Sequence, residues 1–203
     1  MNRDRQIFTV GHSNHRIDFF IRLLMAHAVE LVADVRSSPY SRFNPQFNQA
    51  PLAEELQASG LKYLFVGREL GARTDDPSCY EHGRVRYDRL AATSAFRQGI
   101  ERILHESEGC RIALMCAEKE PLECHRTLLV GRALADMGAN VAHILADGSI
   151  EQHEATLQRL LSETGMSELD LFKSQDEVIG EAVARQERKI AYVDAAHAEG
   201  SMK

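Results

Sequence analysis

Short apolar runs alternate along this chain with longer segments in which apolar residues recur at helical spacing. The runs are rich in Val, Ile and Leu, which is typical of strands buried on both faces of a parallel sheet. The predicted strands are residues 6–11, 30–35, 61–66, 111–116 and 140–145. The predicted helices include residues 17–24, 51–56 and 96–104, a segment from near 124 to before 138, and two segments near 150–163 and 175–188.

This alternation predicts an α/β fold with a mostly parallel open sheet of about five strands, helices on both faces and C-terminal helices. We expect residues 1–150 to form an α/β core domain. Residues 151–203 are expected to form a helical C-terminal extension that packs on the core or serves in oligomer contacts. Residues 67–88 show no clear period, and so long a loop in a compact domain is often functional or mobile.

Composition narrows the class of protein. The chain has 203 residues, enough for one sizeable core, and 44% of them are hydrophobic. No apolar run approaches the ~18 residues of a spanning helix, and the first residues lack an apolar export signal. We therefore expect a cytoplasmic protein without a membrane partner. The net charge of −6 argues against broad nucleic-acid binding but leaves room for a local basic pocket.

Reactive and polar residues follow several predicted strands directly. In open parallel sheets ligands bind beyond the carboxyl ends of the strands, so these residues are expected to share one edge. The first strand is followed by His12 and Ser13, and the second ends in Asp34, Arg36 and Ser37. The fourth is followed, in order, by Cys116, Glu118, Cys124, His125 and Arg126. This convergence is the main indication of a functional site.

The four cysteines are Cys79, Cys110, Cys116 and Cys124, and none of them forms a CxxC pair. In a cytosolic protein of this size, catalytic or metal-binding use is a better explanation than disulfides. Cys124 is predicted at a helix start, where the partial positive charge of the helix and the neighbouring His125 and Arg126 favour a thiolate. We assign no role to Cys79 or Cys110.

Three interpretations of the cysteines remain open. Cys124 or Cys116 is a nucleophile with His125 or His12 as its base, the two bind a metal with one of these histidines, or both are packed in the core. The first is our leading hypothesis, and under it no metal ligand is assigned. Its catalytic residues are Cys116, Cys124, Glu118 and His12, and its substrate-binding residues are Ser13, Asp34, Arg36, Ser37, His125 and Arg126.

Several of these residues also have structural explanations. Ser13 suits the cap of a helix, and Asp34 can bind the backbone of a neighbouring loop. Arg36 directly follows an apolar strand and so needs a partner, which is a substrate anion, Asp34 or Glu118. Arg36 and Arg126 together are expected to hold an anionic group by paired hydrogen bonds.

Several motifs carry a resemblance to a known family. They are Gly11-His12-Ser13-Asn14, Asp34-Val35-Arg36-Ser37-Ser38-Pro39-Tyr40-Ser41, Phe43, Phe47-Asn48, Leu70-Gly71, Cys116-Ala117-Glu118 and Cys124-His125-Arg126. Together they resemble the domain of unknown function 488 family. Asp170-Leu171-Phe172 and Lys189-Ile190-Ala191-Tyr192 are similar to the C-terminal part of its longer members. The resemblance implies an α/β fold with an active site at the cysteine motif and leaves the reaction open.

A second, shorter similarity concerns Cys124-His125-Arg126, which resembles the Cys-His-Arg of O6-alkylguanine-DNA alkyltransferases. In those proteins proline precedes the cysteine and a DNA-binding helix comes earlier in the chain. Here Glu123 precedes it, and the comparable helix containing Arg132 comes afterwards.

The sequence thus favours a cysteine-dependent transferase or hydrolase that acts on a small anionic or nucleotide-like substrate. The alternative is a metal-binding or redox regulatory module without turnover. A nucleic-acid-associated repair or binding protein ranks last, because the chain has no Trp and its Phe and Tyr residues are expected mostly on apolar faces. The sequence names no cofactor and leaves an oligomer open.

Overall fold

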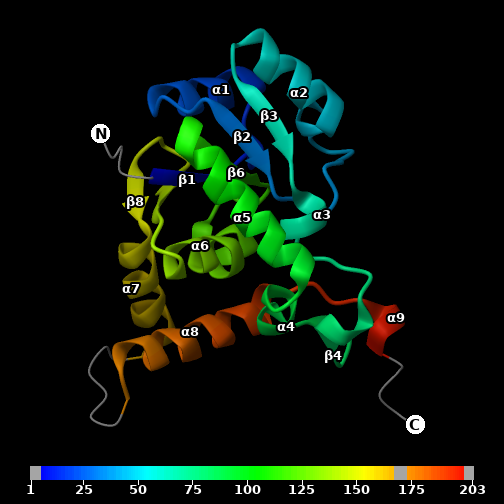
Figure 1. Cartoon of the computed structure of the whole chain (residues 1–203), viewed down its shortest axis with the longest axis vertical. Coiled ribbons are helices and arrows are strands. Elements are labelled where there is room, and N and C mark those ends of the chain that lie inside the picture. Colours follow the sequence, from blue (N-terminus) through cyan, green and yellow to red (C-terminus); the bar gives the residue numbers. More distant parts are fainter. Residues whose placement is uncertain (1–5, 167–172, 199–203) are drawn as a thin grey trace.

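The computed structural model describes residues 6–166 and 173–198, which form an α/β structure around one central sheet (Figure 1). The sheet has six strands in the order β3-β2-β6-β1-β7-β8, of which the first five run parallel. Their bounds are β1 Gln6–Gly11, β2 Leu31–Asp34, β3 Lys62–Phe65, β6 Ile112–Cys116, β7 Asn140–Ile144 and β8 Ile150–Gln152. The five predicted strands and the mostly parallel sheet are confirmed.

The sixth strand corrects the expected start of a helix near residue 150. β8 pairs antiparallel with β7 at the edge of the sheet, and the helix begins only at His153. With three residues, β8 is too short to show a period of its own. In the same way the helix expected to open at Pro51 begins two residues earlier, at Gln49.

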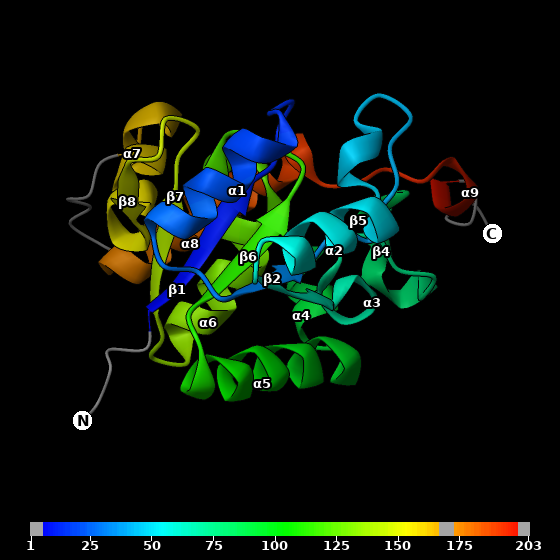
Figure 2. The ribbon, with the colours of Figure 1, turned by 90° about the horizontal axis from the view of Figure 1, so that it is seen from above.

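Side chains alternate along each strand between two faces, and each face has its own core. Phe8, Val32 and Met115 pack in a cluster with α1 and α2, whereas Ile7, Leu31 and Leu114 pack in a cluster with the helices of the opposite face. Figure 2 shows α1 and α5 on opposite sides of the sheet. The helices are α1 Ile17–Ala26 and α2 Gln49–Ala58 on one face, and α5 Ser94–Gly109, α6 Arg132–Asp136, α7 His153–Thr164 and α8 Gln175–Ile190 on the other.

The segment predicted as a loop over residues 67–88 contains regular structure. It holds the short helix α3 Gly67–Leu70, the hairpin β4 Tyr80–Glu81 with β5 Arg84–Val85, and the start of α4 Tyr87–Ala91. At the hairpin turn His82 and Gly83 have φ of 49° and 76°, as a tight two-residue turn between antiparallel strands requires. These elements are too short for a periodic signal, which is why the sequence pattern indicated a loop.

The helices after residue 150 join the same core as the sheet. Leu160 and Leu161 of α7 and Val178 and Val183 of α8 are buried in one cluster with Ile7 and Leu114. The resemblance noted at Asp170-Leu171-Phe172 lies outside the described residues, and so do the first five residues. A role of the C-terminal helices in oligomer contacts stays a prediction. None of the described helices combines the length and apolar character needed to cross a membrane.

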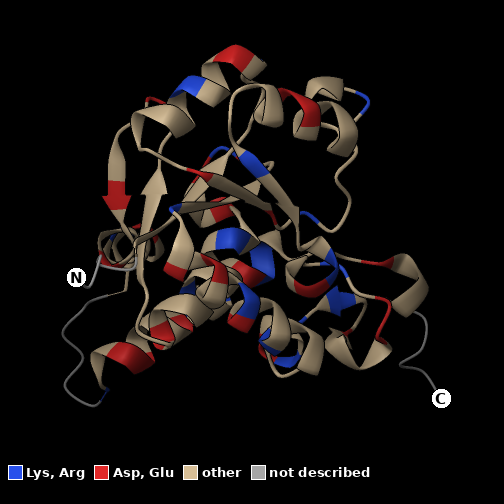
Figure 3. Ribbon diagram, turned by 45° about the horizontal axis from the view of Figure 1, so that its top comes forward, with Lys and Arg blue, Asp and Glu red and all other residues tan. Residues whose placement is uncertain are grey.

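Acidic and basic residues are interspersed along the ribbon, as Figure 3 shows. Two aromatic residues depart from the expectation that Phe and Tyr lie on apolar faces: Tyr40 and Phe43 are 73% and 78% exposed on the loop between β2 and α2. The guanidinium of Arg42 lies over the ring of Phe43.

Candidate active site at the end of the central strand

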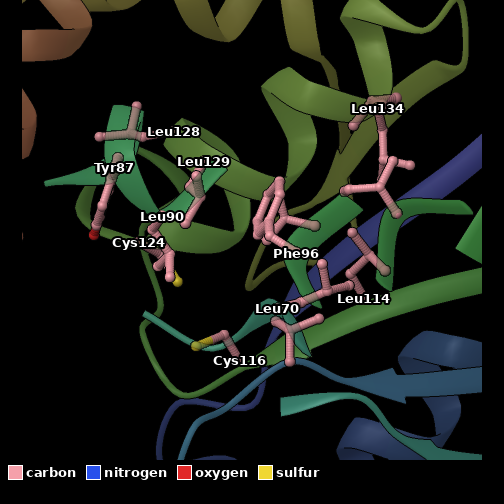
Figure 4. Packing of buried hydrophobic residues seen from close by; sticks show 14 of the residues in the cluster. Leu70, Tyr87, Leu90, Phe96, Leu114, Cys116, Cys124, Leu128, Leu129 and Leu134 are labelled. Carbon is pink, nitrogen blue, oxygen red and sulfur yellow. The ribbon is translucent and has the colours of Figure 1, made fainter. Parts of the chain in front are cut away.

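Strand β6 lies in the middle of the sheet and ends at Cys116. Its neighbours end at the same level, because Gly11 of β1 pairs with Cys116 and Asp34 of β2 pairs with Met115. The residues that follow three adjacent strands therefore meet at one edge, as expected for parallel strands. Figure 4 shows the sulfur atoms of Cys116 and Cys124 facing each other among buried leucines.

Four side chains meet here, and we call Cys116, Glu118, Cys124 and His125 the cysteine centre. Both thiols contact the same oxygen of Glu118, with Sγ–Oε2 distances of 2.9 Å for Cys116 and 3.0 Å for Cys124. The Nδ1 atom of His125 lies 3.7 Å from Sγ of Cys116 and 3.9 Å from Sγ of Cys124. The two cysteines and His125 are buried, whereas Glu118 is exposed to solvent along part of its length.

The orientation of His125 follows from its second ring nitrogen. Nε2 lies 3.1 Å from the carbonyl oxygen of Val35, which can only accept a hydrogen bond. Nε2 therefore carries a hydrogen, and the lone pair of the neutral ring is on Nδ1, facing the sulfurs. Val35 directly follows β2, so the imidazole of His125 is held in place by the residue at the end of a neighbouring strand.

Cys124 stands at the start of a helix, as the sequence predicts. Its carbonyl accepts hydrogen bonds from the amides of Thr127 and Leu128, and its sulfur accepts one from the amide of Arg126 at 3.5 Å. The first turns, Arg126–Gly131, form a π-helix before α6 continues, a distortion that is frequent at functional sites. A sulfur that accepts from a helix amide is stabilised as a thiolate.

The surroundings separate the acidities of the two thiols. Burial raises the pKa of Cys116, and the adjacent Cys124 thiolate and Glu118 raise it further. Burial also opposes ionisation of Cys124, but the hydrogen bond from Cys116 and the positive charges of Arg126 and His125 outweigh it, so the pKa of Cys124 is lowered. The pKa of Glu118 is raised by burial of its carboxyl and by Cys124. For His125, the thiolate overcomes the cost of burial and the pKa is raised.

The side chain of Arg126 makes hydrogen bonds with the main chain. It is fully buried, and its guanidinium donates to the carbonyls of Glu118 at 2.6 Å and Lys119 at 3.2 Å. It therefore holds the loop after β6 in place beside the cysteines. Gly11 packs against the same loop so closely that a Cβ atom there would lie 1.9 Å from the Glu118 carbonyl oxygen.

A second group of charged side chains borders the cysteine centre. The carboxylate of Asp34 accepts from Nε of Arg36 at 2.9 Å and from Nη2 at 2.6 Å, and Tyr63 donates its hydroxyl to the same carboxylate at 2.8 Å. Arg36 also donates to the carbonyl of Phe47 at 2.8 Å. Of the partners considered for Arg36, Asp34 is thus the one observed.

His12 belongs to this second group. Its Nδ1 donates to the carbonyl of Ser13 at 2.8 Å, and its Nε2 accepts from Nη1 of Arg36 at 3.1 Å. Burial and the positive charge of Arg36 lower the pKa of His12 to about 4. Its ring stacks on Phe47 with centroids 4.2 Å apart. Both nitrogens are engaged, so the structure favours His125 over His12 as the base for a thiol.

Ser13 and Ser37 lie at the margin of the site. The hydroxyl of Ser13 donates to the side chain of Asn14, and Ser37 accepts from the amide of Arg73 at 2.9 Å. The first contact joins consecutive residues, and the second holds two separate loops together. Cys79 and Cys110 are free thiols that lie outside the cysteine centre.

Tyr87 is a residue that sequence reasoning missed. It comes from α4, is 5% exposed and packs in the cluster that contains both cysteines. Burial and the charge of Cys124 raise the pKa of its hydroxyl. It lies in the segment that has no period, so no sequence signal pointed to it.

The same atoms are suited to a metal ion. Among the described residues, Sγ of Cys116, Sγ of Cys124 and Nδ1 of His125 lie within 4.8 Å of one another. Two thiolates and an imidazole are common ligands of zinc.

The fold and the site together define an α/β protein with a buried pair of thiols at the carboxyl edge of a parallel sheet. A family model described as a domain of unknown function, DUF488, matches residues 16–133, more than half of the chain, and the chain belongs to this family. The matched region contains Asp34, Arg36 and the cysteine centre but not His12. No curated protein and no solved structure matches the chain.

Proposed function

We propose that this chain is a cytoplasmic cysteine-dependent transferase or hydrolase that acts on a small anionic or nucleotide-like substrate. The observation that supports it is the convergence on one sulfur, Sγ of Cys124, of the His125 imidazole, the Glu118 carboxyl group and a helix amide. A nucleophilic cysteine needs a base within reach and groups that stabilise its thiolate, and these contacts supply both.

The proposed reaction uses each member of the cysteine centre once. Nδ1 of His125 takes the thiol proton of Cys124, and the sulfur attacks an electrophilic atom of the substrate. The bond to the leaving group breaks, and Glu118 in its protonated form gives that group a proton. Water or another acceptor then displaces Cys124 and gives its proton to the Glu118 carboxylate, and His125 returns the first proton to the released thiolate, which completes hydrolysis or transfer. Cys116 keeps its proton and donates a hydrogen bond to the Cys124 thiolate.

Arg36 supports the anionic character of the substrate. A guanidinium has five N–H donors, and the contacts with Asp34, Phe47 and His12 use four of them. One N–H of Arg36 remains for a substrate oxygen. Arg126 donates to only two main-chain carbonyls and its Nε has no partner among the described residues, but the side chain is fully buried. The proposal therefore relies on Arg36 rather than on a pair of arginines.

The experiment that tests the nucleophile is a competition among the four thiols of the native, metal-free chain. Limiting iodoacetamide is added near neutral pH, and mass spectrometry of peptides follows each cysteine. Exposure alone predicts that Cys110 reacts first, since Cys124 is 1% exposed and Cys79 and Cys116 are equally buried. The proposal predicts that Cys124 reacts first, because each unit by which its pKa is lowered raises the thiolate fraction about tenfold.

A matched variant decides what the reactivity depends on. Replacing His125 by Gln is expected to slow the labelling of Cys124 and to leave Cys110 unchanged. Labelling in the order of exposure, with Cys110 ahead of Cys124, contradicts the proposal. If Cys124 leads, phosphorylated and nucleotide compounds are screened for turnover, with Cys124→Ser as the inactive control.

The alternative of a redox or metal-binding module without turnover is favoured by the closeness of the two sulfurs. It also predicts rapid alkylation of Cys124. It differs in predicting that the screen finds no compound that the wild type converts and Cys124→Ser does not.

A further inference from the structure

The distances within the cysteine centre fit a second use of the same atoms. At 3.7 and 3.9 Å the two contacts between sulfur and Nδ1 of His125 are weak hydrogen bonds even for sulfur. In a tetrahedral zinc site, with Zn–S of about 2.3 Å and Zn–N of about 2.0 Å, sulfur and nitrogen ligands lie about 3.6 Å apart. Both contacts are within a few tenths of an ångström of that edge.

We infer that the cysteine centre binds one zinc ion through Sγ of Cys116, Sγ of Cys124 and Nδ1 of His125, with the carboxylate of Glu118 as the fourth, exchangeable ligand. Glu118 already reaches both sulfurs with one oxygen. No Glu118 oxygen belongs to the set of ligand atoms within 4.8 Å of one another, so the carboxylate has to turn toward Nδ1 of His125 to bind the same ion. Its partial exposure leaves room for that movement.

The contacts around the ligands suit a bound metal. Metal-binding histidines usually donate their other ring N–H to an oxygen, and His125 does so to the carbonyl of Val35. The sulfur of Cys124 accepts an amide hydrogen bond from Arg126. Zinc with two thiolates and one carboxylate has a net charge of −1. The buried guanidinium of Arg126, whose charge acts on both thiols, balances it.

Zinc binding has a defined consequence for the thiols. Each Zn–S bond replaces an S–H bond, and the protons of the two thiols go to solvent. One of the three lone pairs of the Cys124 thiolate is then shared with the metal, which lowers its nucleophilicity, and the lone pair of Nδ1 of His125 is no longer free to take a proton. Zinc loading therefore suppresses the proposed nucleophilic chemistry, and this part of the inference rests on the proposed function. The metal acts as a reversible inhibitor of the same centre.

The metal site is tested by titrating the reduced, metal-free chain with Co²⁺ in the absence of oxygen. We expect saturation at one equivalent, a thiolate-to-cobalt charge-transfer band in the near ultraviolet and visible bands of tetrahedral intensity. Added Zn²⁺ should abolish them. A spectrum without thiolate bands, or saturation only at a large excess of cobalt, overturns the inference without use of any variant.

Variants locate the ion. Cys116→Ser and Cys124→Ser each remove one of the two Co–S bonds, so each is expected to lower the charge-transfer intensity at saturation by about half or more. Glu118→Gln is expected to weaken binding by about 10–100-fold, at least the cost of losing a supporting contact. Cys110→Ser is the matched control, since this thiol lies outside the centre, and its spectrum should equal that of the wild type. A band of full intensity in Cys124→Ser places the cobalt elsewhere and contradicts the inference. Circular dichroism of each metal-free variant establishes that it is folded.

Different experiments can contradict the proposed nucleophile and the proposed metal site. Alkylation of the metal-free chain tests the nucleophile, whereas the cobalt spectrum tests the ligands. At a free Zn²⁺ concentration ten times the Kd, the alkylation of Cys124 should slow about tenfold, whereas that of Cys110 should not change. Stoichiometric metal binding that leaves the alkylation rate of Cys124 unchanged contradicts the suppression of nucleophilic chemistry by the metal.

Discussion

At the scale of single residues, buried charges around the site are held by specific partners. Asp34 is fully buried and Arg36 is 6% exposed, and each is the other's counter-ion. A buried pair adds little to stability relative to an apolar pair, but removing one partner is costly because the other charge remains buried. Asp34 is therefore required for Arg36 to remain charged at the buried edge of the sheet without a large loss of stability.

Replacing Asp34 by Asn is expected to lower the free energy of unfolding by about 3–5 kcal/mol, because Arg36 keeps its charge without a counter-ion. Denaturant titration of both proteins at pH 7 measures the difference. Asp18→Asn is the control, since Asp18 makes solvent-exposed ion pairs with Arg16 and Arg22, which contribute little to stability. Equal stabilities of Asp34→Asn and Asp18→Asn contradict the argument.

Sequence reasoning at this scale could predict residue types but not all of their partners. Cys116, Cys124 and His125 meet because a strand end and the next helix start are joined by a short loop, and that could be inferred from the order of elements. The role of Arg126 could not, because its partners are two main-chain carbonyls whose positions depend on the path of the loop. The same holds for His12, whose ring is engaged by Ser13 and Arg36.

At the scale of elements, the site depends on how closely β1 approaches the loop that follows β6. Gly11 ends β1 beside Cys116, and the loop that carries Glu118 crosses directly over it. The backbone amides of His12 and Ser13 donate to the carbonyls of Cys116 and Ala117, which holds the loop against β1. Only a residue without a side chain leaves space for this crossing.

Gly11→Ala is expected to displace the loop and with it the carboxylate of Glu118, since the new Cβ would lie 1.9 Å from a main-chain oxygen. The cost in free energy of unfolding is expected to be at least about 1–3 kcal/mol, as for other overpacked sites. Gly109→Ala is the matched control, because nothing lies within 4 Å of a Cβ at Gly109. Thermal and denaturant unfolding compare the two variants. Similar stability of both would show that the loop can yield at Gly11 without loss.

The five parallel strands could be predicted because each coincides with a nearly continuous apolar run. Residues 67–88 could not be assigned in this way. Their elements are two to five residues long, and their stability comes from contacts made elsewhere in the chain, such as the hydrogen bond from the amide of Tyr87 to Glu187 of α8. Sequence patterns report local periodicity, so a segment ordered by distant contacts resembles a loop.

At the scale of the whole molecule, buried neutral histidines tie stability to pH. Oγ1 of Thr9 lies 2.8 Å from Nδ1 of His143, and Nε2 of His143 lies 3.1 Å from Nδ1 of His153. Burial lowers the pKa of His143 to about 2 and that of His153 to about 4, and positively charged neighbours, Arg126 and Arg159 among them, act against protonation of His143. Both rings are neutral in the folded chain across the physiological range.

The sign of the pH effect follows from these values. In the unfolded chain both imidazoles have the ordinary pKa of about 6.5, so below pH 6.5 the unfolded state binds protons that the folded state does not. Stability therefore falls as the pH decreases, by about 1.4 kcal/mol per pH unit for each histidine. For His153 the loss continues down to about pH 4, and for His143 to about pH 2. Between pH 6.5 and 5 the two together are expected to cost about 3 kcal/mol, because each unfolded imidazole is only half protonated at pH 6.5.

Glu118 and Glu187 oppose this trend, because their pKa values are raised and the folded state holds their protons at higher pH. A comparison of variants isolates the histidines. Replacing both His143 and His153 by Gln is expected to reduce the decline measured by denaturant titration between pH 7 and 5. The part that remains includes the contribution of His12, whose pKa is also about 4. The exposed His105→Gln should keep the wild-type slope. In the wild type, NMR titration should show neither buried imidazole protonating above about pH 4.5, half a unit over the higher of the two values. If His143 or His153 titrates near pH 6.5 in the folded protein, water reaches the two histidines and the sensitivity to acid arises elsewhere.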